Sequence, residues 1–165
     1  MKRRSLAPLA LLPEGALTIL KEVGRHLLRR PIVGIAAVAW DEAGRVVLIR
    51  RGDTGTWALP GGTLEWGETF AEALPRELAE EAGVDLVPGS VELLGVFSSP
   101  DRDPRFHAVT VVVTCKVAGA PRGAKNPLEI REVGAFPPEA RPGPLAMGMD
   151  DYITLAQRRG PPVLE

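Results

Sequence analysis

The stretch Gly61–Val84 constrains this chain more than any other feature, because it concentrates negative charge where a helix is predicted. It reads GGTLEWGETFAEALPRELAEEAGV and holds six glutamates but only one cation, Arg76. Like charges spaced three or four residues apart on a helix repel one another and destabilise it. The same charges become favourable around a hard divalent cation, because such ions prefer oxygen ligands. A solvated acidic helix face is the alternative interpretation.

Capping signals mark both ends of the predicted helix. Thr69 followed three residues later by Glu72 forms a capping-box pattern, and Gly83 is a typical C-terminal glycine. We therefore predict a helix over residues 69–82.

The carboxylates on this helix have fixed relations to one another and to the turn before it. Glu77 and Glu81 are four residues apart and share one face, with Glu80 one step round. Gly61 and Gly62 favour a backbone turn ahead of the helix. Because both ends of the segment are fixed, the pattern favours a metal site over a solvated face.

Pro75 conflicts with a regular helix at this place. A proline in a helix interior removes a backbone N–H, clashes with the preceding turn and costs about 3 kcal/mol. We therefore expect a kink immediately before Arg76.

The remaining pattern predicts a mixed α/β domain at residues 31–165, preceded by an amphipathic arm at residues 1–30. Helices are expected at 14–29, 69–82 and 149–159, and strands at 31–40, 45–51, 91–99, 106–117 and 130–136. The DEAG segment makes the first two strands a hairpin.

The arm carries an apolar stripe at helical spacing, made by Leu17, Leu20, Val23 or Gly24, and Leu27. It would cover the domain or join two copies, and we predict a homodimer.

Composition narrows the possible partners. The formal net charge is −1, so a general affinity for nucleic acid is not expected. Prolines interrupt the apolar N-terminal residues, and no run reaches the roughly 20 apolar residues needed to span a bilayer. We expect a cytoplasmic protein without membrane partners. Cys115, the single cysteine, lies in an alternating apolar stretch and is predicted to be a buried structural thiol.

The acidic segment resembles the signature of the Nudix hydrolases, which is G, five residues, E, seven residues and REUxEExGU, where U is aliphatic. Here it reads Gly62, Glu68 and then RELAEEAGV from Arg76 to Val84, with every fixed position matched. The resemblance implies the Nudix fold, a mixed β-sheet sandwiched between helices (α/β/α). It also implies that Mg²⁺ (or Mn²⁺) supports hydrolysis of a nucleoside diphosphate linked to another moiety.

The same resemblance implies roles for individual residues. Glu77 and Glu81 are expected to be metal ligands, with help from Glu80 and from the carbonyl of Gly61 or Gly62. Arg76 and Glu68 are expected to orient the metal-binding carboxylates.

Two carboxylates are candidates for the general base, Glu77 inside the acidic segment and Glu129 outside it. Glu129 could also be a further metal ligand. Glu132 is the next choice, although its place in a predicted strand favours a structural role.

Substrate contacts are predicted on loops near the acidic segment. A guanidinium can donate two hydrogen bonds to phosphate or ribose oxygens. His107 could reach the site, but a histidine at the start of a strand more often has a structural role than a binding role. The candidates are Arg50, Arg51, Trp57, which stacks on a base or packs beside the glycine turn, Arg102, Asp103 and Arg105. ADP-ribose or a nucleotide sugar is the expected substrate. Nucleoside triphosphates, oxidised ones included, RNA 5′ ends, and a non-catalytic nucleotide-sensing role are the alternatives.

Overall fold

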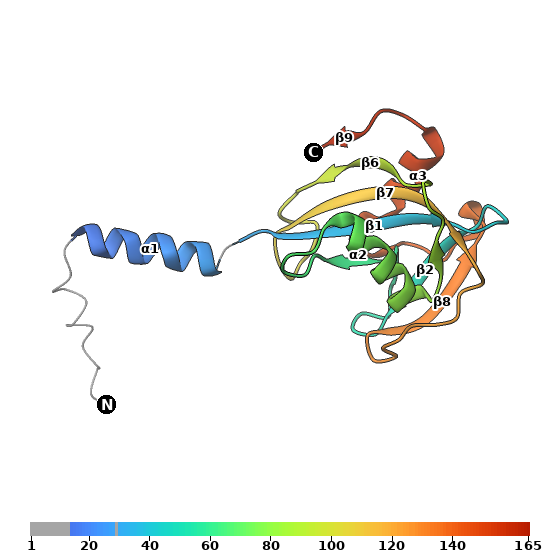
Figure 1. The fold of residues 1–165 in the computed structure, drawn as a ribbon, viewed down its shortest axis with the longest axis horizontal. Coiled ribbons are helices and arrows are strands. Elements are labelled where there is room, and N and C mark those ends of the chain that lie inside the picture. Colours follow the sequence, from blue (N-terminus) through green and yellow to red (C-terminus); the bar gives the residue numbers. More distant parts are fainter. Residues whose placement is uncertain (1–13, 29) are drawn as a thin grey trace. The chain divides into compact units, whose positions relative to one another are not determined.

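The computed structural model describes residues 14–28 and 30–165, and the chain divides into two units, Met1–Pro31 and Ile32–Glu165 (Figure 1). Each unit is described by itself. The first contains helix α1, Glu14–Leu28. Residues 1–13 and 29, which belong to the predicted arm, lie outside the described residues.

Helix α1 carries exposed apolar side chains among its described residues. Ile19, Leu20 and Val23 are exposed by 66%, 52% and 48%, while the side chains of Leu17 and Leu27 lie outside the described part.

The homodimer stays a prediction. Removal of residues 1–28 should weaken it, and multi-angle light scattering measures the change. A monomer for the intact chain at micromolar concentration would contradict it.

The second unit is built on one mixed sheet with the order β3-β2-β1-β7-β6-β9. Strand β4 also pairs with β1, β5 with β7 and β8 with β2. The pairs β1–β7 and β6–β9 are parallel, and the other pairs are antiparallel. The strands are β1 (Ile32–Trp40), β2 (Val46–Arg51), β3 (Trp57–Ala58), β4 (Gly61–Thr63), β5 (Asp85–Leu86), β6 (Glu92–Phe97), β7 (Ala108–Ala118), β8 (Ile130–Phe136) and β9 (Val163–Leu164).

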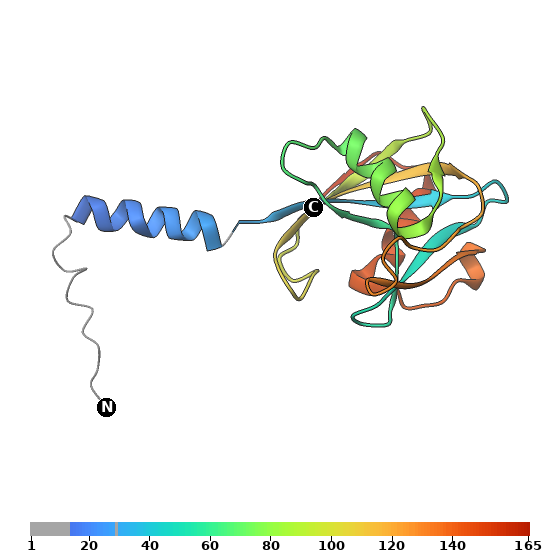
Figure 2. The same ribbon diagram turned by 60° about the horizontal axis from the view of Figure 1, so that its bottom comes forward.

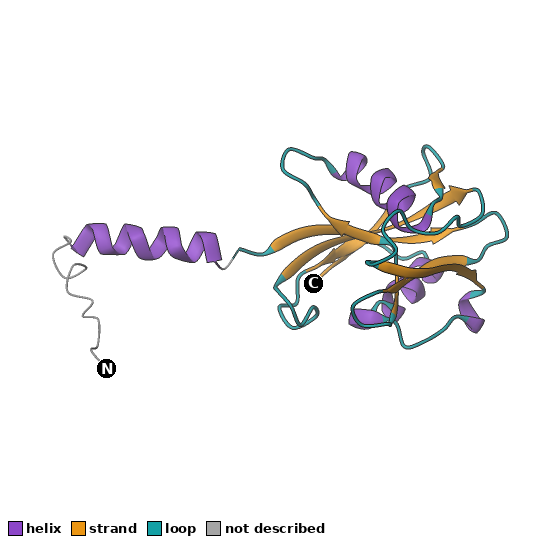
Figure 3. Ribbon diagram, turned by 90° about the horizontal axis from the view of Figure 1, so that it is seen from below, coloured by secondary structure: helices purple, strands orange, loops and turns teal. Residues whose placement is uncertain are grey.

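Helices α2 (Phe70–Glu77) and α3 (Asp150–Arg158) cover opposite faces of this sheet (Figures 2 and 3). The predicted α/β class and helix–sheet–helix layering are therefore confirmed. Two short 3₁₀ turns, Pro138–Ala140 and Ala146–Gly148, precede α3. Within residues 14–28 and 30–165, the helices are too short or too polar to cross a bilayer.

The predicted hairpin of β1 and β2 forms, and its strands diverge. Trp40 pairs with Val46 near the turn, whereas the first half of β1 pairs with β4 at residues 34–36. A Cβ at Gly34 would lie 2.7 Å from the carbonyl oxygen of Gly62. Glycine at residue 34 therefore lets β4 approach β1 closely.

Apolar side chains between the layers form the core. The central strands contribute side chains that are almost fully buried, including Val38, Val46 and Leu48. Cys115 is buried among them, and burial raises the pKa of its thiol to about 12. The thiol is therefore protonated at neutral pH, as a structural cysteine should be.

The predicted helix over 69–82 has two parts. Helix α2 continues through Pro75 to Glu77, and a π-helical turn, Leu78–Ala82, follows it. The irregularity thus lies after Arg76, which differs from the kink expected before it. Gly83 ends the turn in the left-handed conformation with φ of 63°. π-Turns inside helices are frequent at functional sites.

Candidate active site

A cavity of about 470 Å³ lies where β1, β4, the π-turn and several loops meet. Its wall includes Gly61, Gly62, Glu77 and Glu81 from the acidic segment and Glu129 from the loop before β8. Gly61 and Gly62, where a turn was expected, lie in strand β4 and pair with β1. The structure thus brings together this glycine pair, two of the predicted metal ligands and the predicted outside carboxylate.

Glu77 and Glu81 form a crowded acidic wall. Burial is the largest cause that raises the pKa of Glu81, to about 8, and the charges of Glu77 and Glu129 add to it. The Gly61 N–H donates a hydrogen bond to Oε2 of Glu81 at 2.8 Å, and this bond lowers the pKa of Glu81. Burial also raises the pKa of Glu77, partly offset by Arg76. Both ionised carboxylates therefore lack sufficient compensating positive charge within the protein.

Gly62 makes room for Glu77. A Cβ at residue 62 would lie 2.3 Å from Oε1 of Glu77 and 2.6 Å from its Cδ. Any larger residue would displace this carboxylate, which explains why the chain needs glycine at the position.

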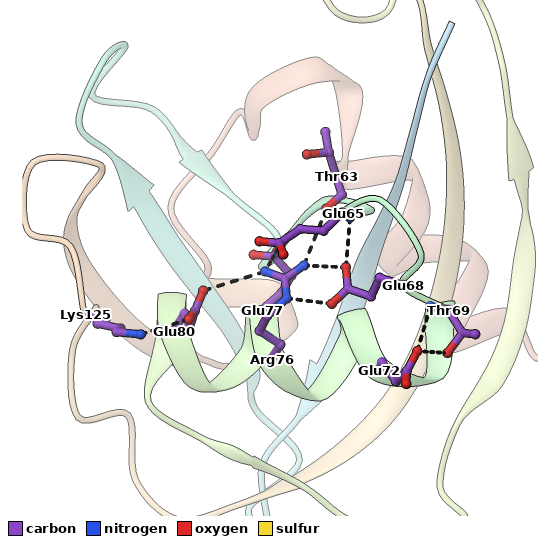
Figure 4. Close-up of polar contacts among 9 residues, drawn as sticks. All are labelled: Thr63, Glu65, Glu68, Thr69, Glu72, Arg76, Glu77, Glu80 and Lys125. Atoms are coloured by element: carbon purple, nitrogen blue, oxygen red, sulfur yellow. Dashed lines mark hydrogen bonds and ion pairs between the residues drawn. The ribbon is translucent and has the colours of Figure 1, made fainter.

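Arg76 links the helix to the loop before it (Figure 4). Its Nε donates to Oε1 of Glu68 at 2.7 Å, and its Nη2 donates to Oε2 at 2.8 Å. This two-point contact lowers the pKa of Glu68 to about 2. The Nη1 of Arg76 donates to Oε1 of Glu77 at 2.9 Å. The geometry therefore allows Glu68 to orient Glu77 through Arg76, the arrangement expected from the sequence.

Glu80 pairs with cations outside the cavity lining. Its Oε1 accepts from Nζ of Lys125 at 3.0 Å, and its Oε2 lies 3.6 Å from Nη1 of Arg76 (Figure 4). It is not among the residues of the cavity wall. The structure thus leaves Glu80 out of the cavity wall that Glu77 and Glu81 form, although Glu80 and Glu77 share Nη1 of Arg76.

The donor set fits a hard divalent cation. Among residues 14–28 and 30–165, no three Asp, Glu, His or Cys side chains already stand in a metal-binding arrangement. Glu77 and Glu81 nevertheless offer carboxylate oxygens on one wall, and burial disfavours their negative charge. A cation would relieve that cost, and Mg²⁺ is commonly held by one or two carboxylates while it keeps several waters.

Four of the six predicted substrate residues lie on the cavity wall, namely Arg51, Arg102, Asp103 and Arg105. Arg50 and Trp57 do not. Arg50 donates to Oε1 of Glu132 at 2.8 Å across strands β2 and β8. Trp57 packs edge-on against Phe136, with the ring centroids 5.0 Å apart, so packing accounts for it.

Arg102 is anchored inside the protein. Its guanidinium forms an ion pair with Glu165 and lies 5.5 Å from the ring centroids of both Phe97 and Tyr152. In the same region, Nε2 of His107 contacts the carbonyl oxygen of Ser98 at 2.8 Å, a contact within the protein framework.

Sequence reasoning missed several residues of this site. Asp53 and Phe106 line the cavity, and so does Tyr152, which is 1% exposed. Asp53 stands in a polar loop, GDTGTW, where a turn residue is unremarkable. Glu165 is 63 residues from its partner Arg102, so no local pattern could have indicated that pair.

Comparison with known proteins gives one family. A family model described as NUDIX domain matches residues 30–156. A protein of Methanocaldococcus jannaschii named ADP-ribose pyrophosphatase is 43% identical over 97 residues, 57% of this chain and 56% of that protein. An RNA pyrophosphohydrolase of Marinomonas sp. is 42% identical over 66 residues, 40% of this chain and 38% of that protein. This chain therefore spans about half or less of these curated relatives.

A solved structure agrees with the match. The crystal structure of a MutT NUDIX hydrolase from Burkholderia pseudomallei superposes with a TM-score of 0.65 at 32% identity. The overlap covers 78% of this chain and 98% of that one.

Proposed function

Because this chain belongs to the NUDIX domain family, we propose that it hydrolyses the diphosphate bond of a nucleoside diphosphate linked to another moiety. The observation that carries this proposal is the acidic wall of Glu77 and Glu81 in a cavity of about 470 Å³. That volume lies within the roughly 300–1,000 Å³ typical of small-molecule sites.

Glu77 and Glu81 would hold Mg²⁺ or Mn²⁺, with Gly61 and Gly62 of β4 beside them. When bound, such an ion neutralises phosphoryl charge and lowers the pKa of a coordinated water. The chain's own residues do the positioning. Glu68 fixes Arg76, Arg76 fixes Glu77, and Gly62 leaves the space that Glu77 fills. Glu129 lines the same cavity and would accept a proton from water or add a metal ligand.

ADP-ribose or a nucleotide sugar is the proposed substrate, and the M. jannaschii relative supports it by its name. An RNA 5′ end or a nucleoside triphosphate is the alternative. A non-catalytic sensor would not need the complete acidic segment that this chain has. We also propose a cytoplasmic location, since all these substrates are found there.

A hydrolysis screen tests the proposal. ADP-ribose, nucleotide sugars, nucleoside triphosphates and triphosphorylated RNA would each be incubated with Mg²⁺ and with Mn²⁺, and the products separated by chromatography. We expect AMP and ribose 5-phosphate from ADP-ribose. Absence of hydrolysis with every substrate and both metals would contradict an enzymatic function.

Arg105 should contribute to substrate choice. Its guanidinium lies on the cavity wall and is 47% exposed. A charge-assisted hydrogen bond contributes roughly 1.5–3 kcal/mol, so Arg105→Ala should lower kcat/KM for the preferred substrate by about ten- to a hundredfold. Arg105→Lys keeps the charge but loses the two-point hydrogen bonding of the guanidinium. Its kcat/KM should lie between those of the unmodified protein and Arg105→Ala.

Arg50→Ala is the matched control, because Arg50 bonds Glu132 outside the cavity. Its kcat/KM should change less than about twofold, the range of an exposed ion pair. Equal losses in the Arg105 and Arg50 variants would exclude a role for Arg105 in substrate choice.

A further inference from the structure

A chain of ion pairs crosses the cavity wall between two loops. Nε of Arg51 lies 3.0 Å from Oδ1 of Asp53, and Nη2 of Arg51 lies 2.6 Å from Oδ2. The same Oδ2 lies 3.7 Å from Nη1 of Arg105. Asp53 thus stands between a guanidinium at the end of β2 and a guanidinium on the loop before β7. All three residues line the cavity.

The two carboxylates that bind Arg105 are held very differently. Asp103 is 6% exposed and accepts three bonds from Arg105, from the main-chain N at 2.9 Å, Nε at 3.0 Å and Nη2 at 2.7 Å. Asp53 is 51% exposed and reaches Arg105 only at 3.7 Å. Asp103 therefore holds and aims Arg105. Asp53 is held by Arg51 and by the Thr54 N–H, so only its long, exposed contact with Arg105 is open to exchange with another anion.

The two guanidiniums line the same cavity as the acidic wall of Glu77 and Glu81. The charge of Arg51 acts on Glu81, where it opposes the larger effect of burial on the pKa. Arg51 also acts on Asp103, whose pKa is lowered chiefly by Arg105. An anion that contacts both guanidiniums would therefore lie next to the place where the scissile diphosphate is proposed to bind.

We propose that Asp53 is a specificity-determining counter-ion for this site. It occupies the anion position between Arg51 and Arg105 in the free protein, and phosphoryl oxygens of the substrate displace it from Arg105. Its negative charge also repels ligands that bring additional charge to this position, so it selects against nucleoside triphosphates and for diphosphate esters. Like charges placed against a competitor are a recognised source of selectivity. This inference rests on the proposed function.

Asp53→Asn tests the inference, because it removes the charge and keeps an oxygen for the Thr54 N–H, which donates to Oδ1 at 2.7 Å. Loss of one exposed competing ion pair should lower KM for ADP-ribose about two- to fivefold, with kcat unchanged. The gain in kcat/KM should be larger for ATP. An equal gain on both substrates would overturn the selection against triphosphates.

Asp41→Asn is the matched control. Asp41 pairs with Arg45 at 2.7 Å and accepts main-chain N–H bonds in its own turn, as Asp53 does, but it is not part of the cavity wall. Its KM values should equal those of the unmodified protein.

Equilibrium binding separates this inference from the proposed hydrolysis. Imidodiphosphate, in which nitrogen replaces the bridging oxygen, would be titrated into each protein in Mg²⁺ by calorimetry. The Asp53→Asn variant should bind it about two- to fivefold more tightly. If no substrate is hydrolysed but this tightening is seen, the proposed function fails and the counter-ion role stands. Unchanged or weaker binding would overturn the counter-ion role.

Discussion

Glu77→Gln and Glu81→Gln should each lower kcat/KM by at least about a hundredfold, the order expected when the ligands of a catalytic metal are disturbed. Glutamine keeps the size of the side chain and removes one anionic oxygen donor. Both carboxylates line the cavity, so neither loss can be attributed to a distant change. The measurement is steady-state kinetics on the best substrate at saturating Mg²⁺. Near-normal turnover in both variants would contradict the metal assignment.

Glu80→Gln is the sharpest control, because the sequence places it with the ligands and the structure does not. Its carboxylate bonds Lys125 at 3.0 Å and stays outside the cavity wall. We expect a loss of less than about tenfold, since a residue that acts through Arg76 or Lys125 changes the site only indirectly. A loss as large as that of Glu81→Gln would mean that Glu80 turns to the metal when it binds.

The unfolding stability of Glu81→Gln should show whether its loss of activity comes from loss of a metal ligand or from misfolding. The unfolded chain ionises Glu81 near pH 4.5, whereas burial holds it protonated in the fold up to about pH 8. The metal-free protein therefore loses stability as pH rises between these values. Glu81→Gln has no such proton to lose, so it should be at least as stable as the unmodified chain at pH 8. Urea unfolding at pH 5 and pH 8, in a chelator, measures the difference.

The acidic segment was predictable because its contacts are local. Glu68, Arg76 and Glu77 lie within ten residues, so a loop and one helix are enough to bring them together. The five longer strands were predictable for the same reason, since each carries its own apolar pattern. The short strands β3, β4, β5 and β9, of two or three residues each, carry too little pattern to be found.

The partners of Glu80 and Arg102 could not be predicted from the sequence, because they lie far away along the chain. Glu80 turns to Lys125, 45 residues away, and Arg102 pairs with Glu165, 63 residues away. Neither spacing follows from helix or strand periodicity. Pro75 is a different case, because the α-helix continues through it to Glu77 and changes to a π-helical turn only at Leu78.

Gly62→Ala should separate activity from stability more clearly than any carboxylate substitution. The added Cβ would lie 2.3, 2.6 and 2.9 Å from Oε1, Cδ and Oε2 of Glu77, the mobile end of a long side chain. Glu77 can swing away at small cost to the fold, but its carboxylate then leaves the cavity wall. We expect kcat/KM to fall about a hundredfold while the melting temperature changes by only a few degrees.

Gly61→Ala, one residue earlier, should show the opposite balance. Its Cβ would meet main-chain atoms, the carbonyl oxygen of Ile35 at 2.2 Å and Cα of Ala36 at 2.7 Å, and its φ is 151°. Backbone cannot swing aside, so this variant should lose roughly 1–3 kcal/mol of unfolding free energy. Gly160→Ala, with nothing within 4 Å of the added Cβ, controls for the substitution itself. Calorimetry and kinetics on the three variants check the contrast. If Gly62→Ala keeps full activity, the position of Glu77 does not limit the reaction. The proposal that Glu68 and Arg76 position Glu77 for catalysis would then be contradicted.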